Sequence, residues 1–127
     1  MIDPASVTVL AVDDDAGMLA LCAAIFRRAG YSIITALTAA TALQALHDNP
    51  SISLLVTDIK MPEIDGFKLA DMAKVRRPNL KIIYVTGFGD EVDTLPGIRH
   101  GPILNKPYPA ERLREEARRA LTSADRR

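Results

Sequence analysis

The chain has 127 residues, which fits one domain of the usual size of roughly 100–200 residues. Hydrophobic residues make up 48% of it and charged residues 25%, a composition typical of a globular domain that folds without disulfides or metals. The charges of sixteen basic and sixteen acidic residues cancel, which argues against a protein whose overall charge attracts nucleic acid or a membrane. The charge is unevenly distributed, however, with a net charge of −5 over residues 1–66 and +5 over residues 67–127.

In chain order, short apolar runs alternate with helical stripes. The runs are rich in β-branched residues and predict five buried strands, at residues 7–12, 31–36, 52–57, 81–86 and 103–105. Apolar residues at helical spacing predict helices over residues 18–29, from the N-cap Thr38 to residue 48, around residues 69–77, and from about Pro109 onward. The pattern over residues 90–95 is weaker, and Pro96 interrupts it.

This alternation defines the fold class. Strands separated by helices predict an α/β protein with a parallel sheet covered by helices on both faces. Right-handed crossovers leave few topologies, of which the flavodoxin-like doubly wound order 2-1-3-4-5 is the most common for five such units. We expect the helix before the fifth strand to be short or irregular, because Pro96, Gly97, Gly101 and Pro102 crowd that segment.

The single cysteine and the hydropathy pattern indicate a compartment. Cys22 cannot form an internal disulfide, which fits a reducing compartment, and it lies on an apolar stripe, so we expect it in the core. The early apolar stretch over residues 7–12 is too short for a signal-peptide core or a membrane span. We therefore expect a cytoplasmic protein that binds neither membrane nor nucleic acid.

Polar residues gather where the predicted strands end. In this topology the ligand crevice lies above the carboxyl ends of the first and third strands. Acidic residues follow both of these strands, and a hydroxyl and an ammonium follow the fourth and fifth: Asp13, Asp14, Asp15, Asp58, Thr86 and Lys106. The sequence therefore predicts one polar site at this edge of the sheet.

These carboxylates favour a hard cation. Two like charges about 4 Å apart repel by roughly 4 kcal/mol at an effective dielectric near 20. Ligands that are all oxygens point to Mg²⁺, and a lysine and a threonine beside it are typical of a phosphoryl site. The simpler interpretation, a solvated helix cap at Asp13–Asp15, explains neither Asp58 nor Lys106.

Four segments in chain order resemble response-regulator receiver domains of bacterial two-component signalling, from about Val7 to Leu121. They are Val12-Asp13-Asp14, Thr57-Asp58-Ile-Lys-Met-Pro62-Glu-Ile-Asp-Gly66, Val85-Thr86-Gly87 and Asn105-Lys106-Pro107-Tyr108. The resemblance implies that Asp58 accepts a phosphoryl group from a histidine of a sensor kinase. It also implies that Asp14, Asp58 and the backbone carbonyl of Lys60 hold Mg²⁺, with Asp13 acting through water.

The resemblance assigns further roles on the last two strands. Lys106 would pair with the phosphoryl group, Thr86 would hydrogen-bond to it, and the Lys106–Pro107 peptide bond would be cis. At the position three before the lysine, which in the family holds a switch aromatic, this chain has Ile103. Because Ile103 has no ring, we expect phosphorylation to order residues 87–102 instead, with Thr86 as the sensor.

Lys60 and Phe88 bear on hydrolysis of the phosphorylated form, and His47 and His100 are the two histidines of the chain. Lys60 and Phe88 flank the path of hydrolytic water in the family, and neither side chain can orient that water. We expect His47 and His100 to be plain surface residues. On the last helix we expect a solvated charged face with Glu115 and Arg119 paired one turn apart.

The sequence is thus interpreted as one receiver domain over residues 1–127, with its core at about residues 7–121. It would be a stand-alone regulator or the receiver part of a hybrid histidine kinase. Its partners would be a histidine kinase or histidine phosphotransfer protein and a downstream protein. It would be no conventional enzyme, because it catalyses only its own phosphorylation and autodephosphorylation at Asp58.

Two alternatives remain open, and a third is disfavoured. One is a pseudo-receiver that binds partners without phosphorylation. The other is a Mg²⁺-dependent phosphohydrolase of the haloacid-dehalogenase type, with Asp13 and Asp15 as its catalytic pair, although this leaves Asp58 idle. An FMN-binding flavodoxin is disfavoured because the acids at residues 13–15 would repel the phosphate.

Overall fold

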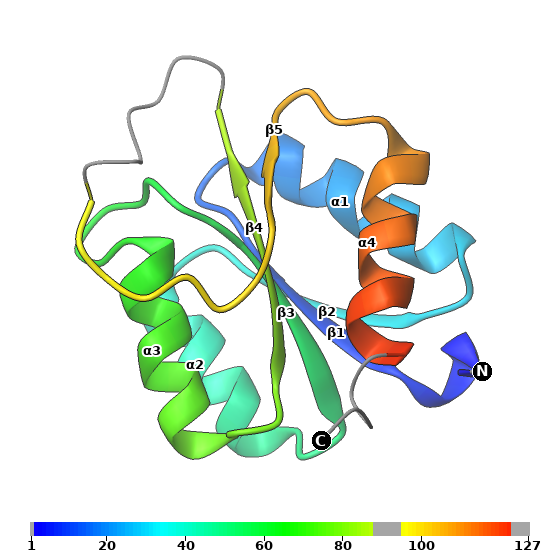
Figure 1. Cartoon of the computed structure of the whole chain (residues 1–127), viewed down its shortest axis with the longest axis horizontal. Coiled ribbons are helices and arrows are strands. Elements are labelled where there is room, and N and C mark those ends of the chain that lie inside the picture. Colours follow the sequence, from blue (N-terminus) through cyan, green and yellow to red (C-terminus); the bar gives the residue numbers. More distant parts are fainter. Residues whose placement is uncertain (1, 88–94, 123–127) are drawn as a thin grey trace.

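The computed structural model describes residues 2–87 and 95–122, in which strands and helices alternate (Figure 1). The strands are β1 (Thr8–Val12), β2 (Ser32–Ala36), β3 (Ile52–Asp58), β4 (Lys81–Thr86) and β5 (Ile103–Asn105). The helices are α1 (Ala16–Arg28), α2 (Ala39–Asp48), α3 (Gly66–Arg76) and α4 (Ala110–Thr122), with a 3-10 turn at Pro4–Ser6. All five predicted strands are present within one residue of their expected bounds.

The strands form one parallel sheet in the order β2-β1-β3-β4-β5. This is the predicted flavodoxin-like, doubly wound order, and it places β2 and β5 at the two edges. The register pairs Val12 with Thr57 and Asp58 with Val85, so the carboxyl ends of β1, β3 and β4 lie side by side. The order therefore brings the polar residues after these strands to one edge of the sheet.

Each face of the sheet is covered by two helices (Figure 1). On one face α2 and α3 pack against the sheet, and the buried core there includes Leu46, Phe67 and Tyr84. On the other face α1 and α4 cover a second core, which includes Phe26 and Leu113. Strands buried on both faces explain why their sequences are continuous apolar runs rather than alternating patterns.

Three helices begin at a side-chain cap. The Asp15 carboxylate accepts from the backbone N–H groups of Gly17 and Met18, and the Thr38 hydroxyl accepts from that of Thr41. The Asp65 carboxylate accepts from the backbone N–H of Lys68 in the same way. Such caps satisfy backbone donors that have no partner in the first helical turn. The N-cap role predicted for Thr38 is confirmed.

The connection from β4 to β5 contains no helix among its described residues, 95–102. Residues 88–94, which include Phe88 and most of the weak helical pattern at 90–95, lie outside the described residues. Within the described parts of the chain, none of the helices has the length and apolar character needed to cross a membrane.

Several single-residue expectations have an outcome in the structure. Cys22 is buried in the core, and burial raises the pKa of its thiol to about 11, which keeps the thiol protonated at neutral pH. On α4, Arg119 pairs with Glu115 at 3.5 Å, as expected. His47 is exposed, but the expectation for His100 is wrong, because its Nε2 lies 2.7 Å from Asp71 Oδ1 and its side chain is only 19% exposed.

Candidate functional site

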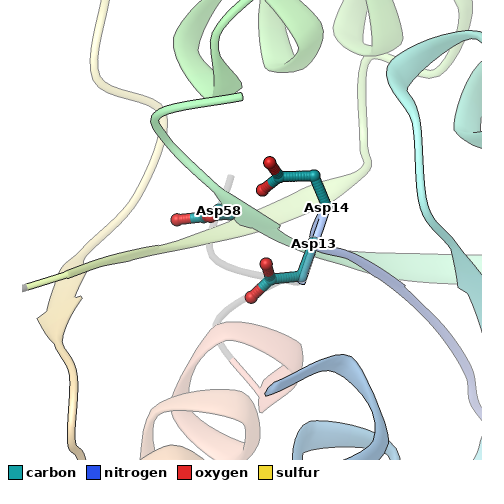
Figure 2. Close-up of side chains that lie close together, drawn as sticks. All are labelled: Asp13, Asp14 and Asp58. Carbon is teal, nitrogen blue, oxygen red and sulfur yellow. The ribbon is translucent and has the colours of Figure 1, made fainter. Parts of the chain in front are cut away.

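Three carboxylates meet at the carboxyl ends of the two central strands. Asp13 and Asp14 follow β1, and Asp58 is the last residue of β3. One oxygen from each carboxylate lies within 4.8 Å of the others, and Figure 2 shows the three side chains pointing to the same side. Asp13 and Asp58 are buried, whereas Asp14 is exposed. The cluster is therefore anchored in the protein and open to solvent at Asp14.

The Lys106 ammonium lies beside this cluster. Its Nζ is 2.8 Å from Asp13 Oδ2, to which it donates a hydrogen bond, and 3.5 Å from Asp58 Oδ2. Burial acts to lower the pKa of Lys106, but the hydrogen bond and charge of Asp13 and the charge of Asp58 raise it above its ordinary value. Lys106 is therefore a permanent positive charge between two of the three carboxylates.

Asp58 is the carboxylate whose protonation is most perturbed. Its pKa is raised from 3.8 to about 6, mainly by burial and then by the charge of Asp13, while Lys106 and the backbone N–H of Ile59 act to lower it. The Ile59 N–H donates a hydrogen bond to Asp58 Oδ1 at 3.0 Å, and Asp58 as a whole is only 6% exposed. Because burial and the neighbouring acids disfavour the charged form of Asp58, an additional cation bound beside it would stabilise that form.

The backbone around Asp58 is held by close contacts. The N–H of Gly66 donates to the carbonyl of Ile59 at 2.7 Å, which closes the loop between β3 and α3. A Cβ at Gly66 would lie 2.3 Å from the carbonyl oxygen of Asp58, so only glycine fits there.

The sequence analysis missed Asp65 as the N-cap of α3, although an aspartate just before a run of apolar residues at helical spacing is a known signal for the start of a helix.

The last two strands bring in the other predicted residues. Thr86 ends β4 and is buried, and its carbonyl accepts from the backbone N–H of Lys106 at 2.7 Å. The Lys106–Pro107 peptide bond is cis, as expected. Ile103 begins β5, where it packs, partly buried, against the core beneath α2 and α3. Lys60 is exposed in the turn after β3.

Asp15 does not join the carboxylate cluster. Its side chain caps α1, with Oδ1 2.9 Å from the N–H of Gly17, while its own N–H donates to Asp13 Oδ1 at 2.9 Å. Of the three consecutive acids predicted for the site, two face it and the third begins the helix.

The donor set fits a divalent cation. Asp13, Asp14 and Asp58 offer only carboxylate oxygens, the ligands preferred by Mg²⁺, and their mutual repulsion is only partly offset by Lys106. Backbone carbonyls of the exposed turn at Lys60 are of the same hard-donor type. The residues present can therefore hold such an ion with part of its coordination left to water or substrate.

Comparison with known proteins agrees with this fold and site. Residues 9–118 match the family described as response regulator receiver domain. The two-component response regulator ORR24 of rice (Oryza sativa) is 36% identical over 114 residues, which are 87% of this chain and 18% of that protein. The chain thus spans about a fifth of the length of this relative.

Solved structures give the same result. A response regulator receiver protein from Sinorhizobium medicae superposes with a TM-score of 0.84 at 27% identity, covering 94% of this chain and 98% of that one. The receiver domain of NtrX from Brucella abortus gives 0.80 at 33% identity, covering 91% and 98%. The fold, the site and the family match define a receiver domain. The chain belongs to the response regulator receiver domain family.

Proposed function

We propose that this domain accepts a phosphoryl group on Asp58 from a phosphohistidine, in a reaction that requires Mg²⁺. The main supporting observation is the surroundings of the Asp58 carboxylate, which lies 3.5 Å from the Lys106 ammonium and within 4.8 Å of carboxylate oxygens of Asp13 and Asp14. The ammonium, together with a cation held by these carboxylates, would neutralise the negative charge of a transferring phosphoryl group. Positioning and charge neutralisation are the main requirements of phosphoryl transfer.

The transfer step balances without a further reactant. An oxygen of the Asp58 carboxylate bonds to phosphorus, the phosphorus–nitrogen bond of the phosphohistidine breaks, and its electron pair stays on the imidazole nitrogen. Lys106 pairs with the phosphoryl oxygens, and the Thr86 hydroxyl hydrogen-bonds to them once they are in place. In autodephosphorylation, the oxygen of a water molecule bonds to phosphorus, and the bond between phosphorus and the Asp58 oxygen breaks with its electron pair staying on the carboxylate. Inorganic phosphate leaves with the protons of the water.

The metal would be held by the chain's own oxygens. Asp14, Asp58 and the backbone carbonyl of Lys60 would be ligands, and Asp13 would act through a bound water. Mg²⁺ would supply positive charge to the phosphoryl oxygens. The proximity of the three carboxylate oxygens, within 4.8 Å of one another, supports this set.

The wider role follows from this chemistry. The donor would be a histidine kinase or a histidine phosphotransfer protein, and the phosphorylated form would act through a downstream protein. Residues 1–127 would form one receiver domain, in a stand-alone regulator or in a hybrid histidine kinase, working in the cytoplasm. Thr86 would be the sensor of the switch, and the aliphatic Ile103 would not provide a moving ring.

One alternative is disfavoured by the geometry. A phosphohydrolase of the haloacid-dehalogenase type would need the carboxylates of Asp13 and Asp15 in the same site. Asp15 instead caps α1 through its contacts with Gly17 and Met18. The pseudo-receiver alternative depends on whether Asp58 is phosphorylated at all.

A mass measurement tests the proposal. The protein is incubated with phosphoramidate, a small donor with a phosphorus–nitrogen bond, in the presence of Mg²⁺. We expect the intact mass to rise by one phosphoryl group, in the control Asp48→Asn as in the parent, but not in Asp58→Asn or after chelation of Mg²⁺. No gain in the parent protein would instead favour a pseudo-receiver.

A further inference from the structure

Residues 95–101, here termed the strap, lie between β4 and β5 in the segment that was expected to be irregular because of its prolines and glycines. The strap has no helical residues and runs beside α3 before the chain enters β5 (Figure 1, yellow). Leu95 packs against the core, and two consecutive strap residues contact side chains of α3 and β4. They join elements that lead directly to Asp58 and Thr86.

Arg99 and His100 make these contacts. The guanidinium carbon of Arg99 lies 3.7 Å from the centre of the Phe67 ring, a cation–π contact. His100 Nε2 lies 2.7 Å from Asp71 Oδ1, and the His100 backbone N–H donates to the Tyr84 hydroxyl at 3.1 Å. The strap is thus tied to α3 through two residues and to β4 through one.

The end of the strap lies directly against β4. A Cβ at Gly101 would lie 1.9 Å from the carbonyl oxygen of Ile82, so a larger residue would lift the strap from the strand. The N–H of Tyr84 donates to the carbonyl of Pro102 at 2.9 Å, which begins the pairing with β5. The strap therefore cannot move away from β4 without breaking the contact at the Tyr84 hydroxyl.

Tyr84 is a fixed point in the core beneath the strap. It is fully buried, and its ring packs edge-on against Phe67 with ring centres 4.8 Å apart. In the sheet it pairs with Ile103, and it lies two residues before Thr86, so both side chains leave the same face of β4. This chain thus has an aromatic residue on β4 beside Ile103, the position on β5 at which the family has its switch aromatic.

Two routes out of the site converge on the strap. One runs along β4 from Thr86 to the Tyr84 hydroxyl and its partner His100. The other runs from Asp58 through the tight turn at Gly66 to Phe67, the second residue of α3. The Phe67 ring makes the cation–π contact with Arg99. Both routes connect the site to the same two strap residues, Arg99 and His100.

We propose that Tyr84 is a positioning residue, whose hydroxyl couples the state of Asp58 to the strap, and that phosphorylation tightens the strap's attachment. This inference rests on the proposed function. Residues 95–102 include Arg99 and His100 but no acid. An aspartyl phosphate carries close to two negative charges, which favours the attached strap with its cationic side chain. Coupling is reciprocal, so the attached strap in turn stabilises the phosphorylated form.

The test removes only the hydroxyl. Tyr84→Phe keeps the ring that packs on Phe67, and Tyr31→Phe is the matched control. The Tyr31 ring also packs edge-on against a phenylalanine, Phe26, but on the opposite face of the sheet. Amide hydrogen exchange at His100, followed by NMR, reports the attachment of the strap. The half-life of the phosphorylated form, after loading with phosphoramidate and removal of the donor, reports the coupling.

The expected result has two parts. In the parent protein, phosphorylation slows exchange of the His100 amide. In Tyr84→Phe that amide exchanges faster, and the half-life of the phosphorylated form shortens by roughly two- to fivefold, as expected when a hydrogen bond is lost. Tyr31→Phe behaves as the parent in both measurements.

Several results would overturn the inference. They are an unchanged half-life in Tyr84→Phe, an equal shortening in Tyr31→Phe, or no effect of phosphorylation on the His100 amide in the parent. Thermal unfolding of both variants shows whether a shortened half-life reflects general destabilisation, which would also count against coupling. Failure of the proposed function is a different outcome, because the parent protein would then gain no phosphoryl mass on Asp58.

Discussion

The ammonium of Lys106 lies closer to Asp13 than to Asp58, at 2.8 Å from one carboxylate and 3.5 Å from the other. Asp13 therefore holds the lysine within reach of Asp58. The lysine also lowers the pKa of the Asp58 carboxyl, against the effects of burial and of Asp13. Its charge competes with any metal ion bound by the same carboxylates.

The first prediction concerns this competition. Lys106→Ala removes a positive charge beside the carboxylate cluster, so Mg²⁺ should bind several-fold more tightly than to the parent protein. In the metal-free variant the pKa of Asp58 should rise above about 6. Calorimetric titration with Mg²⁺ measures the first effect, and Lys68→Ala, an exposed position on α3, is the control. Weaker Mg²⁺ binding in Lys106→Ala would show that the lysine supports the metal.

The second prediction separates the consecutive acids after β1. Asp14→Asn and Asp58→Asn should each weaken Mg²⁺ binding by about tenfold or more, because each removes a charged ligand. Asp15→Asn should change it little, because the Asp15 carboxylate caps α1 and an asparagine can accept the same bonds. Titration of the three variants compares them, and equal losses in all three would contradict this assignment.

The third prediction concerns pH and the stability of the metal-free protein. The pKa of Asp58 is raised from 3.8 to about 6 on folding, so the folded state binds this proton more tightly than the unfolded state. The free energy of unfolding should therefore fall as pH rises from about 4 to about 6, and the penalty is complete above that range. Asp58→Asn should remove this dependence and stabilise the fold at pH 7 by roughly 1–3 kcal/mol.

Urea unfolding with a chelator present, at several pH values, measures this effect. Asp48→Asn, at the exposed end of α2, should keep the parental pH dependence. Added Mg²⁺ should stabilise the parent protein more than Asp58→Asn at pH 7, because it binds the folded carboxylate cluster. A parent protein equally stable at pH 4.5 and pH 7 would argue against the raised pKa.

Comparison of sequence and structure shows which features local patterns encode. The strands were predictable because buried parallel strands need continuous apolar runs, and the meeting of Asp13 with Asp58 followed from the strand order alone. The prolines and glycines of the strap predicted an irregular segment, but they carry no periodicity that would show what the segment packs against. The pair of His100 and Asp71, which attaches the strap to α3, joins residues 29 positions apart. A histidine at such a distance from its partner is indistinguishable, in sequence, from a surface residue.

The fourth prediction concerns the lifetime of the phosphorylated form. The turn after Asp58 exposes Lys60, and a lysine cannot act as an acid or amide that positions the hydrolytic water. Lys60→Glu should therefore leave autodephosphorylation unchanged or make it faster, since a carboxylate can orient water. Phosphate release after loading with phosphoramidate measures the rate, with Lys68→Glu as control for the charge change. A slower rate in Lys60→Glu alone would assign the lysine a part in hydrolysis.

The fifth prediction concerns the donor of the phosphoryl group. An apolar groove runs between α1 and the loop that follows Lys106, and it is lined by Met18, Leu21, Ala24, Ile25, Arg28, Pro107, Tyr108, Ala110 and Arg114. Leu21 is 59% exposed there and lies among other apolar side chains of the groove. A helix of a histidine phosphotransfer protein or kinase, with acidic residues facing Arg28 and Arg114, would fill this groove beside the site.

Leu21→Asp tests this surface without touching the chemistry. It places a charge in the groove, so it should slow transfer from a phosphohistidine protein by about tenfold or more, since a buried apolar side chain contributes roughly 1.5–3 kcal/mol. Transfer from phosphoramidate should be unchanged, because a small donor needs no groove. Val75→Asp, an exposed apolar position on α3, is the control and should affect neither donor. If both donors were slowed equally by Leu21→Asp, the groove would not be the docking surface, and the change would have acted on the site itself.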